Sequence, residues 1–367
     1  MRRRRILIAL TACALLTGCA SNAKKAAWTP PASSAGPASA SPVSVQQGAP
    51  PSTSASPSAS PKAKPKPSAK PTTTKAAATK HCSILPSNNV WNHSAAHLPV
   101  ASKSSAYVSS IGTGAAVHAD FGSGTWDGGP IGIPITTVPA GQKKVSVSFQ
   151  YASESDKGPY PIPSNAKVEG GSHADGDRHV IVYDASTCTD YELFSAYPKS
   201  GGSWKAGSGA IYDLSSNKLR HAGWTSADAA GLPILPGLVT YAEVASGHID
   251  HAIRVTVPRS QAAYLWPARH EASSSHDTSL PPMGLRLRLK ASVDISHLPK
   301  QARIIAQAMK TYGVIVADNG SPWYISGAPD SHWNNDQLHA LGGLTGSDFE
   351  AVDESGLMVS SSSGATR

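Results

Sequence analysis

The chain has 367 residues, of which 40% are hydrophobic and 15% are charged, and its formal net charge at pH 7 is +8. Twelve of its 32 Lys and Arg residues precede His81, whereas all 24 Asp and Glu residues follow it. Residues 81–367 therefore carry a net negative charge, which argues against a nucleic-acid-binding domain. They are numerous enough to bury a large core, and we expect them to form a single domain.

The N-terminus has the pattern of an export signal. Arginines at positions 2–5 precede an apolar run at 6–16 that is too short to cross a membrane, which predicts a signal peptide at 1–18. The sequence Leu16-Thr17-Gly18-Cys19 resembles the lipobox of bacterial lipoproteins. This resemblance implies that Cys19 is lipidated. The chain would then be exported and anchored to the cell membrane, facing outside or toward the cell wall.

A segment of low complexity follows the signal. Residues 20–80 consist mainly of Ala, Ser, Pro, Thr and Lys, with one aromatic and no acidic residue. Such a composition cannot bury enough apolar surface to offset the entropy lost on folding. We expect residues 19–80 to be a lipid-anchored, disordered tether that carries an extracellular domain.

The chain contains four cysteines. Cys13 lies in the signal peptide and Cys19 would take the lipid, which leaves Cys82 and Cys188. In an oxidising compartment this pair predicts a disulfide, with two free thiols as the alternative.

Short runs rich in β-branched and aromatic residues alternate with turn residues along the domain. They predict a mainly β fold, a sandwich or jelly-roll-like domain, with a few helices near the C-terminus. Strands are expected at 144–149, 179–183, 191–194, 248–257 and 285–290. One helix should begin at Pro299 and end before Gly313, and Asn334 should cap a short helix that reaches Leu341. Asn319-Gly320, between two apolar runs, predicts a β-hairpin.

The strand expected at 247–257 carries the leading catalytic candidates. Alternation places His248, Asp250 and Arg254 on one face. A histidine oriented by a carboxylate could transfer a proton, and the guanidinium could neutralise the carboxyl group of an acidic sugar. The alternative is a solvated strand face with an internal ion pair. His251, on the other face, is expected to be a hydrogen-bonded core histidine.

A second alternating run extends the possible basic surface. Arg286, Arg288 and Lys290 line one face of the strand expected at 285–290. Next to the first strand they would suit uronic acids or phosphate-bearing polymers. A sheet edge protected by cations is the alternative.

Aromatic and polar residues cluster further along the chain. An aromatic ring beside amides and charged groups suits a sugar, because C–H groups pack on the ring while hydroxyls need hydrogen-bond partners. Core tryptophans are the alternative. The substrate-binding candidates are Trp266, Arg269, His270, Asp318, Trp323, Trp333 and Asn335.

The pattern His-x-Asp occurs three times, at His118, His173 and His248, and Glu169 and Asp177 lie near the second copy. These residues could bind a metal or supply paired carboxylates, and polar turn chemistry explains the Gly-rich stretch equally well. We expect no metal and no cofactor.

Two resemblances concern the domain. His248-Ile249-Asp250 and Lys290-Ala291-Ser292 stand in the order of two strand motifs of alginate-lyase-type jelly rolls, although His replaces a Gln and Asp replaces the His of the first motif. Residues 177–353, with Gly223-Trp224-Thr225-Ser226 near their centre, resemble uncharacterised secreted proteins of soil bacteria. The first resemblance implies a polysaccharide lyase, and the second implies no particular activity.

The sequence thus predicts a monomeric, surface-anchored lipoprotein whose domain binds and cleaves a cell-wall or environmental polysaccharide. Its reaction would be that of a polysaccharide lyase or a glycoside hydrolase. A non-catalytic cell-wall-binding or structural module is the alternative. The expected partners are the membrane, through the lipid, and a carbohydrate or cell-wall polymer, but no nucleic acid.

Overall fold

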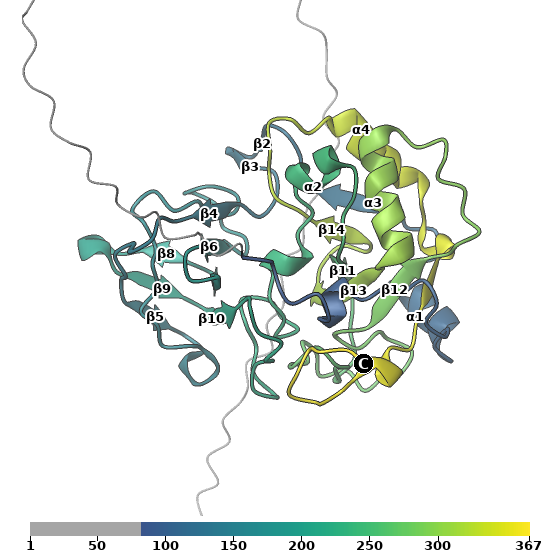
Figure 1. The fold of residues 1–367 in the computed structure, drawn as a ribbon, viewed down its shortest axis with the longest axis horizontal. Helices are drawn as coiled ribbons and strands as arrows, with labels where there is room; N and C mark the ends of the chain where they lie inside the picture. Colours follow the sequence, from purple (N-terminus) through teal and green to yellow (C-terminus); the bar gives the residue numbers. More distant parts are fainter. Residues whose placement is uncertain (1–81) are drawn as a thin grey trace, which may run out of the picture. The chain divides into compact units, whose positions relative to one another are not determined.

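The computed structural model describes residues 82–367 (Figure 1). The signal peptide, the lipidation of Cys19 and the tether predicted at 19–80 lie outside the described residues. Within the described part of the chain, no helix has the length and apolar character needed to cross a membrane.

The fold mixes α and β structure, with more strand than helix, and its strands form several small sheets. No closed barrel forms within residues 82–367, and the sheets are not clearly arranged as the expected sandwich or jelly roll. The largest sheet has the order β1-β14-β11-β13-β12-β15. Its strands are β1 (His118–Asp120), β11 (Ile253–Val257), β12 (Arg286–Leu289), β13 (Val314–Asn319), β14 (Tyr324–Ser326) and β15 (Phe349–Ala351).

Three smaller sheets account for the other strands. A four-stranded sheet contains β4 (Ile135–Thr137), β6 (Val180–Asp184), β7 (Thr189–Phe194) and β10 (Ser208–Asp213). A three-stranded sheet contains β5 (Val147–Phe149), β8 (Tyr197–Pro198) and β9 (Trp204–Ala206), and a hairpin contains β2 (Thr125–Trp126) and β3 (Gly129–Pro130).

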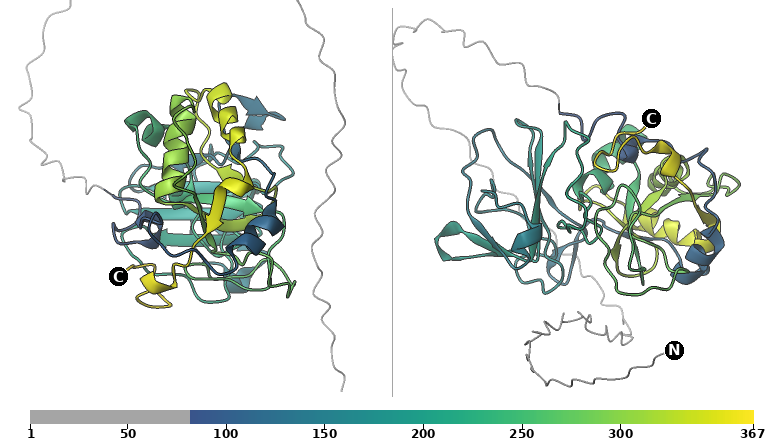
Figure 2. Two further views of the ribbon diagram at one scale, coloured as in Figure 1. Left: turned by 90° about the vertical axis from the view of Figure 1, so that its right-hand side faces the viewer. Right: turned by 90° about the horizontal axis from the view of Figure 1, so that it is seen from below.

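The α-helices of the described residues are α1 (Ser104–Ile111), α2 (Tyr241–Ser246), α3 (Lys300–Thr311) and α4 (Asn335–His339). Figure 2 shows α3 and α4 lying together beside the largest sheet. Helix α3, which lies where the sequence predicts a helix, buries the apolar stripe of Ala302, Ile305 and Met309, and burial of this stripe stabilises the helix on the sheet. Pro299 precedes the helix as its N-cap instead of occupying its first turn.

Other local features also match the sequence. The strands expected at 179–183 and 191–194 form as β6 and β7, which pair in antiparallel order with Asp184 opposite Thr189. Cys188 lies in the turn between them. The side chain of Asn334 accepts a hydrogen bond from the backbone N–H of Gln337 at 3.0 Å and so caps α4.

The hairpin predicted at Asn319-Gly320 is wrong. Strand β11 lies between β13 and β14, parallel to the first and antiparallel to the second. Asn319 continues β13, and the N–H of Gly320 donates to the carbonyl of Val257 in β11. Since β11 takes these backbone hydrogen bonds, β13 and β14 do not pair with each other.

The strand predicted at 248–257 is shorter than expected. Helix α2 ends at Ser246 and is capped by Gly247, which has the left-handed conformation with φ of 100°. Residues 248–252 then form a loop, in which the N–H of Ala252 donates to Trp91, and β11 begins only at Ile253. The alternation argued for His248 and Asp250 therefore does not apply.

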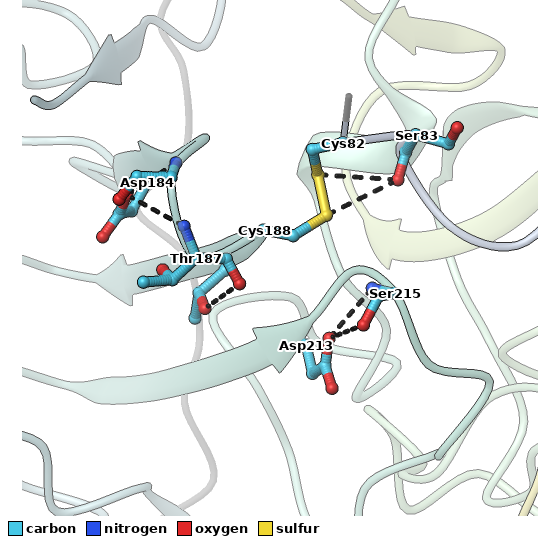
Figure 3. The surroundings of a disulfide bond; sticks show 9 residues. Cys82, Ser83, Asp184, Thr187, Cys188, Asp213 and Ser215 are labelled. Carbon is cyan, nitrogen blue, oxygen red and sulfur yellow. Dashed lines mark hydrogen bonds between the residues drawn. A yellow bond between two sulfur atoms is a disulfide. The ribbon is translucent and has the colours of Figure 1, made fainter. Parts of the chain in front are cut away.

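Cys82 and Cys188 lie in disulfide geometry, with their Cα atoms 5.4 Å apart (Figure 3). The bond would close a loop across a sequence separation of 106 residues, joining the first described residue to the β6–β7 turn. In the chain-entropy model, a loop of about 100 residues stabilises the fold by roughly 4–5 kcal/mol.

We expect the denatured, unreduced protein to show no alkylation at either cysteine, and the reduced protein to show alkylation at both. Peptide mass spectrometry of the iodoacetamide-treated chain measures this. Reduction should also lower the free energy of unfolding, by roughly 4–5 kcal/mol at most. Labelling of Cys82 or Cys188 before reduction would show that the pair is not bonded.

Candidate functional site

The structure separates the residues expected to form one catalytic face. His248 and Asp250 lie on the loop after α2, with side chains 64% and 69% exposed, and their facing atoms are 3.3 Å apart. Arg254 lies on β11 and is only 4% exposed. The expected face of His248, Asp250 and Arg254 is therefore not formed. His251 is part-buried and hydrogen-bonds to Glu243 at 2.9 Å, as expected of a packed histidine.

Arg254 lies in a buried polar network inside the fold. Its guanidinium donates to Asp228 at 2.7 Å, to Asp318 at 3.1 Å and to the Ser326 hydroxyl at 2.8 Å. Burial outweighs the attraction of Arg254 and raises the pKa of Asp228 to about 6 and that of Asp318 to about 7. Asp318 thus serves as a partner of Arg254, which corrects its expected role as a separate substrate-binding residue.

The predicted tryptophans do not form an aromatic face. Trp323 is 1% exposed, stacks on Phe349 and donates to the carbonyl of Gly112. Trp333 is also buried and donates to the carbonyl of Ala328. Both are core residues, the alternative considered from the sequence.

Trp266, Arg269 and His270 are likewise engaged within the fold. Trp266 is half-buried and donates to the carbonyl of Ser363, and Arg269 donates to the carbonyl of Ser361. They hold the C-terminal segment in place. The Nδ1 atom of His270 lies 3.0 Å from the carbonyl oxygen of Ala229.

The cations of the basic face expected at 285–290 are also bonded to groups within the fold. Arg286 is buried and pairs with Glu354 at 3.2 Å, and Arg288 pairs with Glu350 at 2.8 Å. The ammonium group of Lys290 donates to the carbonyl of Ser347. Since each cation has a partner within the chain, this strand presents no free basic surface.

A different set of residues surrounds a cleft of about 570 Å³ beside β1, at the edge of the largest sheet. The cleft is lined by two carboxyl groups, one largely exposed indole and, of the residues predicted to bind substrate, only Asn335. Its polar and aromatic lining consists of His118, Asp120, Trp126, Glu169, Tyr324, Asn335 and His339.

Strand pairing positions the first carboxylate. Strand β1 runs parallel to β14, so that His118 lies opposite Tyr324 and Asp120 lies opposite Ser326. The rings of His118 and Tyr324 stack with centroids 4.2 Å apart. Because side chains two residues apart share one face of a strand, Asp120 projects from the same face as this stacked pair.

The second carboxylate belongs to a loop that Arg178 holds in shape. The guanidinium of Arg178, which is buried, donates to the carbonyls of Gly171, Ser172 and Ala174. Glu169 stands at the start of this loop, and its backbone N–H donates to the carbonyl of His179. The loop is therefore fixed at both ends by residues next to β6.

The hairpin of β2 and β3 supplies the indole. Asp127 and Gly128 form its two-residue turn, and both have positive φ, as the turns preferred in tight hairpins require. Trp126 is 80% exposed at this turn. A Cβ atom at Gly129 would overlap the backbone of Gly170, so this close approach requires glycine and holds the hairpin against the loop that carries Glu169.

His179 keeps Glu169 ionised. Its Nδ1 atom lies 2.6 Å from Glu169 Oε2, and its Nε2 atom lies 3.0 Å from the carbonyl oxygen of Ala227. Both ring nitrogens face acceptors, which only the imidazolium satisfies fully. Although burial opposes the charge, the carboxylate of Glu169 raises the pKa of His179 to about 9. Burial alone would raise the pKa of Glu169, but His179 outweighs it and holds that pKa below its ordinary value.

Asp120 shows the opposite shift. Although its side chain is exposed to solvent, partial desolvation beside the cleft raises its pKa above the ordinary aspartate value, and the charge of Glu169 raises it further. The cleft thus holds one carboxyl group, Asp120, whose raised pKa favours the protonated form, and another, Glu169, whose lowered pKa favours the ionised form.

Comparison of the chain with known protein families, with curated proteins and with solved structures finds no match. The chemistry of the cleft is therefore what indicates the function. Among residues 82–367, no group of three or more His, Cys, Asp or Glu side chains is arranged to hold a metal ion.

Sequence reasoning noted Asp120 and Glu169 only as members of a loose pattern and missed Trp126. The dipeptide Asp127-Gly128 was the available signal, because Asp-Gly is a preferred turn of a two-residue hairpin. It indicates a hairpin with Trp126 beside the turn, where side chains are exposed. His173 and Asp175, from the same pattern, are exposed on the loop that Arg178 holds.

Proposed function

We propose that the protein is a surface-anchored lipoprotein whose domain binds a cell-wall or environmental polysaccharide in this cleft and hydrolyses it. The observation that supports this most directly is the pair Asp120 and Glu169. Two carboxyl groups in one cleft, with pKa values shifted in opposite directions, are what acid–base cleavage of a glycosidic bond requires.

The roles follow from the two environments. Asp120 retains its proton to a higher pH and would protonate the oxygen of the leaving sugar. Glu169, ionised by His179, would act as the base that activates water or as the nucleophile at the anomeric carbon. His179 does not line the cleft and would act as a positioning residue that maintains the charge and orientation of Glu169.

Hydrolysis suits the cleft better than the lyase reaction. A lyase removes a proton next to a sugar carboxylate, and a nearby cation favours this step by stabilising the negative charge that develops. The cleft is lined by no Lys or Arg side chain. It does contain the paired carboxyl groups that hydrolysis uses.

Trp126 offers the binding surface. Its exposed indole can pack against the C–H face of a sugar, while His339 can hydrogen-bond to hydroxyls. The amide of Asn335 already accepts from the N–H of Ser123 and donates to its carbonyl, so Asn335 serves mainly to shape the cleft. The exposed indole also favours the second candidate function, a non-catalytic wall-binding module, in which this surface would bind a glycan without cleaving it.

A panel of soluble glycans tests both functions, with binding measured by calorimetry and cleavage by the release of reducing ends. Replacement of Trp126 by alanine should weaken binding about tenfold, since loss of one stacked ring costs roughly 1.4 kcal/mol. The fold should remain intact because the indole is exposed.

Tyr151→Ala is the matched control, because Tyr151 is an exposed aromatic residue that does not line the cleft. It should leave the affinity unchanged. Binding without any release of reducing ends would favour the wall-binding module. Equal affinities of wild type and Trp126→Ala for every glycan bound would contradict both functions at this cleft.

A further inference from the structure

A second cleft, of about 580 Å³, lies at the three-stranded sheet of β5, β8 and β9 (Figure 1). It is lined by residues 142–146, which precede β5, by residues 162–164, and by the ends of β8 and β9 with their connection. We call it the lysine cleft, because its charged side chains are those of Lys143 and Lys144. It shares no lining residue with the cleft beside β1, so a ligand bound here is distinct from the proposed glycan substrate.

Backbone hydrogen bonds fix the walls of the lysine cleft. Val145 and Tyr160 exchange two of them, at 2.8 and 3.0 Å, which ties the segment that carries the lysines to the chain before Ile162. On the other side, the N–H of Trp204 donates to the carbonyl of Ser146 at 3.0 Å. Because its walls are already held in place, the cleft can accept a ligand with little loss of backbone entropy.

The lining of the lysine cleft carries positive charge and no negative charge. It contains no Asp or Glu, and lysine side chains are protonated at neutral pH. Among residues 82–367, no carboxylate oxygen lies within 4.0 Å of the ammonium group of Lys143 or Lys144. Lys143 is also exposed, so its charge is available to a ligand.

Tyr191 holds the second ammonium group in position. Lys144 donates to the Tyr191 hydroxyl at 3.1 Å, and its Nζ atom lies 5.3 Å from the centroid of the Tyr191 ring. A phenol is uncharged at neutral pH, so this contact does not neutralise Lys144. The hydroxyl occupies one of three N–H donors of the ammonium group, which leaves others for a ligand.

Hydroxyl groups complete the lining. Ser146, Ser164 and Ser203 all line the lysine cleft, and in the described part of the chain their hydroxyls make no side-chain hydrogen bond. Each can donate to an oxygen atom of a ligand. Ammonium and hydroxyl donors without a competing carboxylate favour anionic oxygens, of the kind that phosphate and carboxylate groups carry.

The shape and surroundings of the lysine cleft favour a flexible polymer over a membrane or a nucleic acid. The cleft is larger than a single phosphate group, so neighbouring anionic groups of one chain can enter together. None of the large hydrophobic side chains exposed on residues 82–367 lines it, whereas membrane-binding surfaces usually present such side chains. Its aromatic ring, that of Trp204, is 6% exposed and offers no open face on which a nucleobase could stack.

We propose that the lysine cleft binds an anionic polyol or saccharide polymer through the phosphate or carboxylate groups of that polymer. The ammonium groups of Lys143 and Lys144 attract the anionic groups, and the serine hydroxyls donate to their oxygens. The inference does not rest on the glycan hydrolysis proposed for the cleft beside β1. It places the basic binding surface on the three-stranded sheet, and not at residues 285–290, where the sequence indicated one.

Protection of lysines from acetylation tests the site directly. The full-length mature protein is treated with the N-hydroxysuccinimide ester of acetic acid, and peptide mass spectrometry follows the rate at each lysine. Poly(glycerol phosphate) or polygalacturonate, at twice its dissociation constant, should slow the acetylation of Lys143 about threefold, because about two thirds of the sites are then occupied. Neutral dextran should have no effect. Protection by the first polymer alone identifies phosphate as the bound group, and protection by the second alone identifies carboxylate.

Lys300 is the internal control, because it is exposed at the start of α3 and does not line the lysine cleft. Its acetylation rate should not change with any polymer. Lys143→Gln should lower the affinity for the protecting polymer about two- to fivefold, the usual effect of one exposed charge pair, and Lys300→Gln should not. The difference should shrink in about 0.5 M salt, which screens exposed charges. Both variants keep the lysines of residues 19–80, so any binding by that segment is the same in both.

An acetylation rate of Lys143 that neither anionic polymer changes would overturn the proposal, as would equal affinities of Lys143→Gln and Lys300→Gln. Protection by phosphatidylglycerol vesicles but by neither polymer would show that the lysine cleft contacts a membrane instead. Stronger protection by single-stranded DNA than by either polymer would identify a nucleic-acid site. Each of these results would leave the hydrolysis proposed for the cleft beside β1 standing, because the two clefts share no residue.

Discussion

Replacement of Glu169 by glutamine will lower kcat for glycan hydrolysis by about 10²- to 10⁴-fold, the usual cost of losing a general base. Glutamine has nearly the same shape but cannot accept a proton or attack a sugar. Its amide also cannot stabilise the imidazolium of His179, so the pKa of His179 should fall from about 9. Release of reducing ends measures the first effect, and NMR titration of the His179 ring measures the second.

The pH dependence of hydrolysis should be bell-shaped, with its limbs set by the two shifted carboxyl groups. Activity should fall on the acid side as Glu169 takes up a proton, and because its pKa is lowered this limb lies below the ordinary glutamate range. Activity should fall on the alkaline side as Asp120 loses its proton, and because its pKa is raised this limb lies above the ordinary aspartate range. Asp120→Asn should lower kcat and remove the alkaline limb from the remaining activity.

Glu271→Gln is the matched control for Glu169→Gln, because Glu271 is exposed and does not line the cleft. It should retain full activity. Hydrolysis by both Glu169→Gln and Asp120→Asn at rates within threefold of wild type would show that these carboxyl groups are not the catalytic pair.

Replacement of Arg254 by methionine will lower the free energy of unfolding by about 3–5 kcal/mol at pH 8, because it removes the guanidinium with which Asp228 and Asp318 both pair. Urea unfolding followed by circular dichroism measures this. Arg303→Met is the control. Arg303 is exposed on α3, and its loss should change stability by no more than about 0.5 kcal/mol.

The deficit of Arg254→Met should depend on pH. The folded pKa values of Asp228 and Asp318, about 6 and about 7, lie above those of an unfolded aspartate, near 3.9. Their contribution is therefore fully present in acid and is lost as the pH rises through the folded pKa values. Without the guanidinium, ionisation becomes costlier, so the difference from wild type should be smaller at pH 5 than at pH 8.

An Arg254→Met protein that is as stable as wild type at pH 8, but binds acidic glycans less tightly, would contradict this assignment. Arg254 would then act on substrate, as its place in the sequence suggested.

The local elements were predictable because their signals depend on few neighbouring residues. The apolar stripe of α3 and the cap at Asn334 each involve contacts within one or two helical turns. The β6–β7 hairpin joins runs that are close in sequence and separated by a short turn. Such elements form wherever the surrounding fold leaves room for them.

The placement of β11 depended on partners far away in the sequence. Alternation alone indicated a strand from His248, but the left-handed Gly247 at the end of α2 and the contact of Ala252 with Trp91 delay its start to Ile253. Its insertion between β13 and β14 also removed the expected hairpin. Strand pairing of this kind is a property of the whole sheet, and a local pattern does not contain it.

The sequence by itself predicts export and a Cys82–Cys188 pair, and it indicated a domain with more strand than helix and the residue types suited to sugar chemistry. Only the tertiary structure decided which of them meet. It buried Arg254, Trp323 and Trp333 and brought Asp120 and Glu169, from a sheet edge and a distant loop, to one cleft. The physical reason is that burial and charge pairing depend on neighbours supplied by long-range contacts, whereas composition and periodicity report only what each segment could do alone.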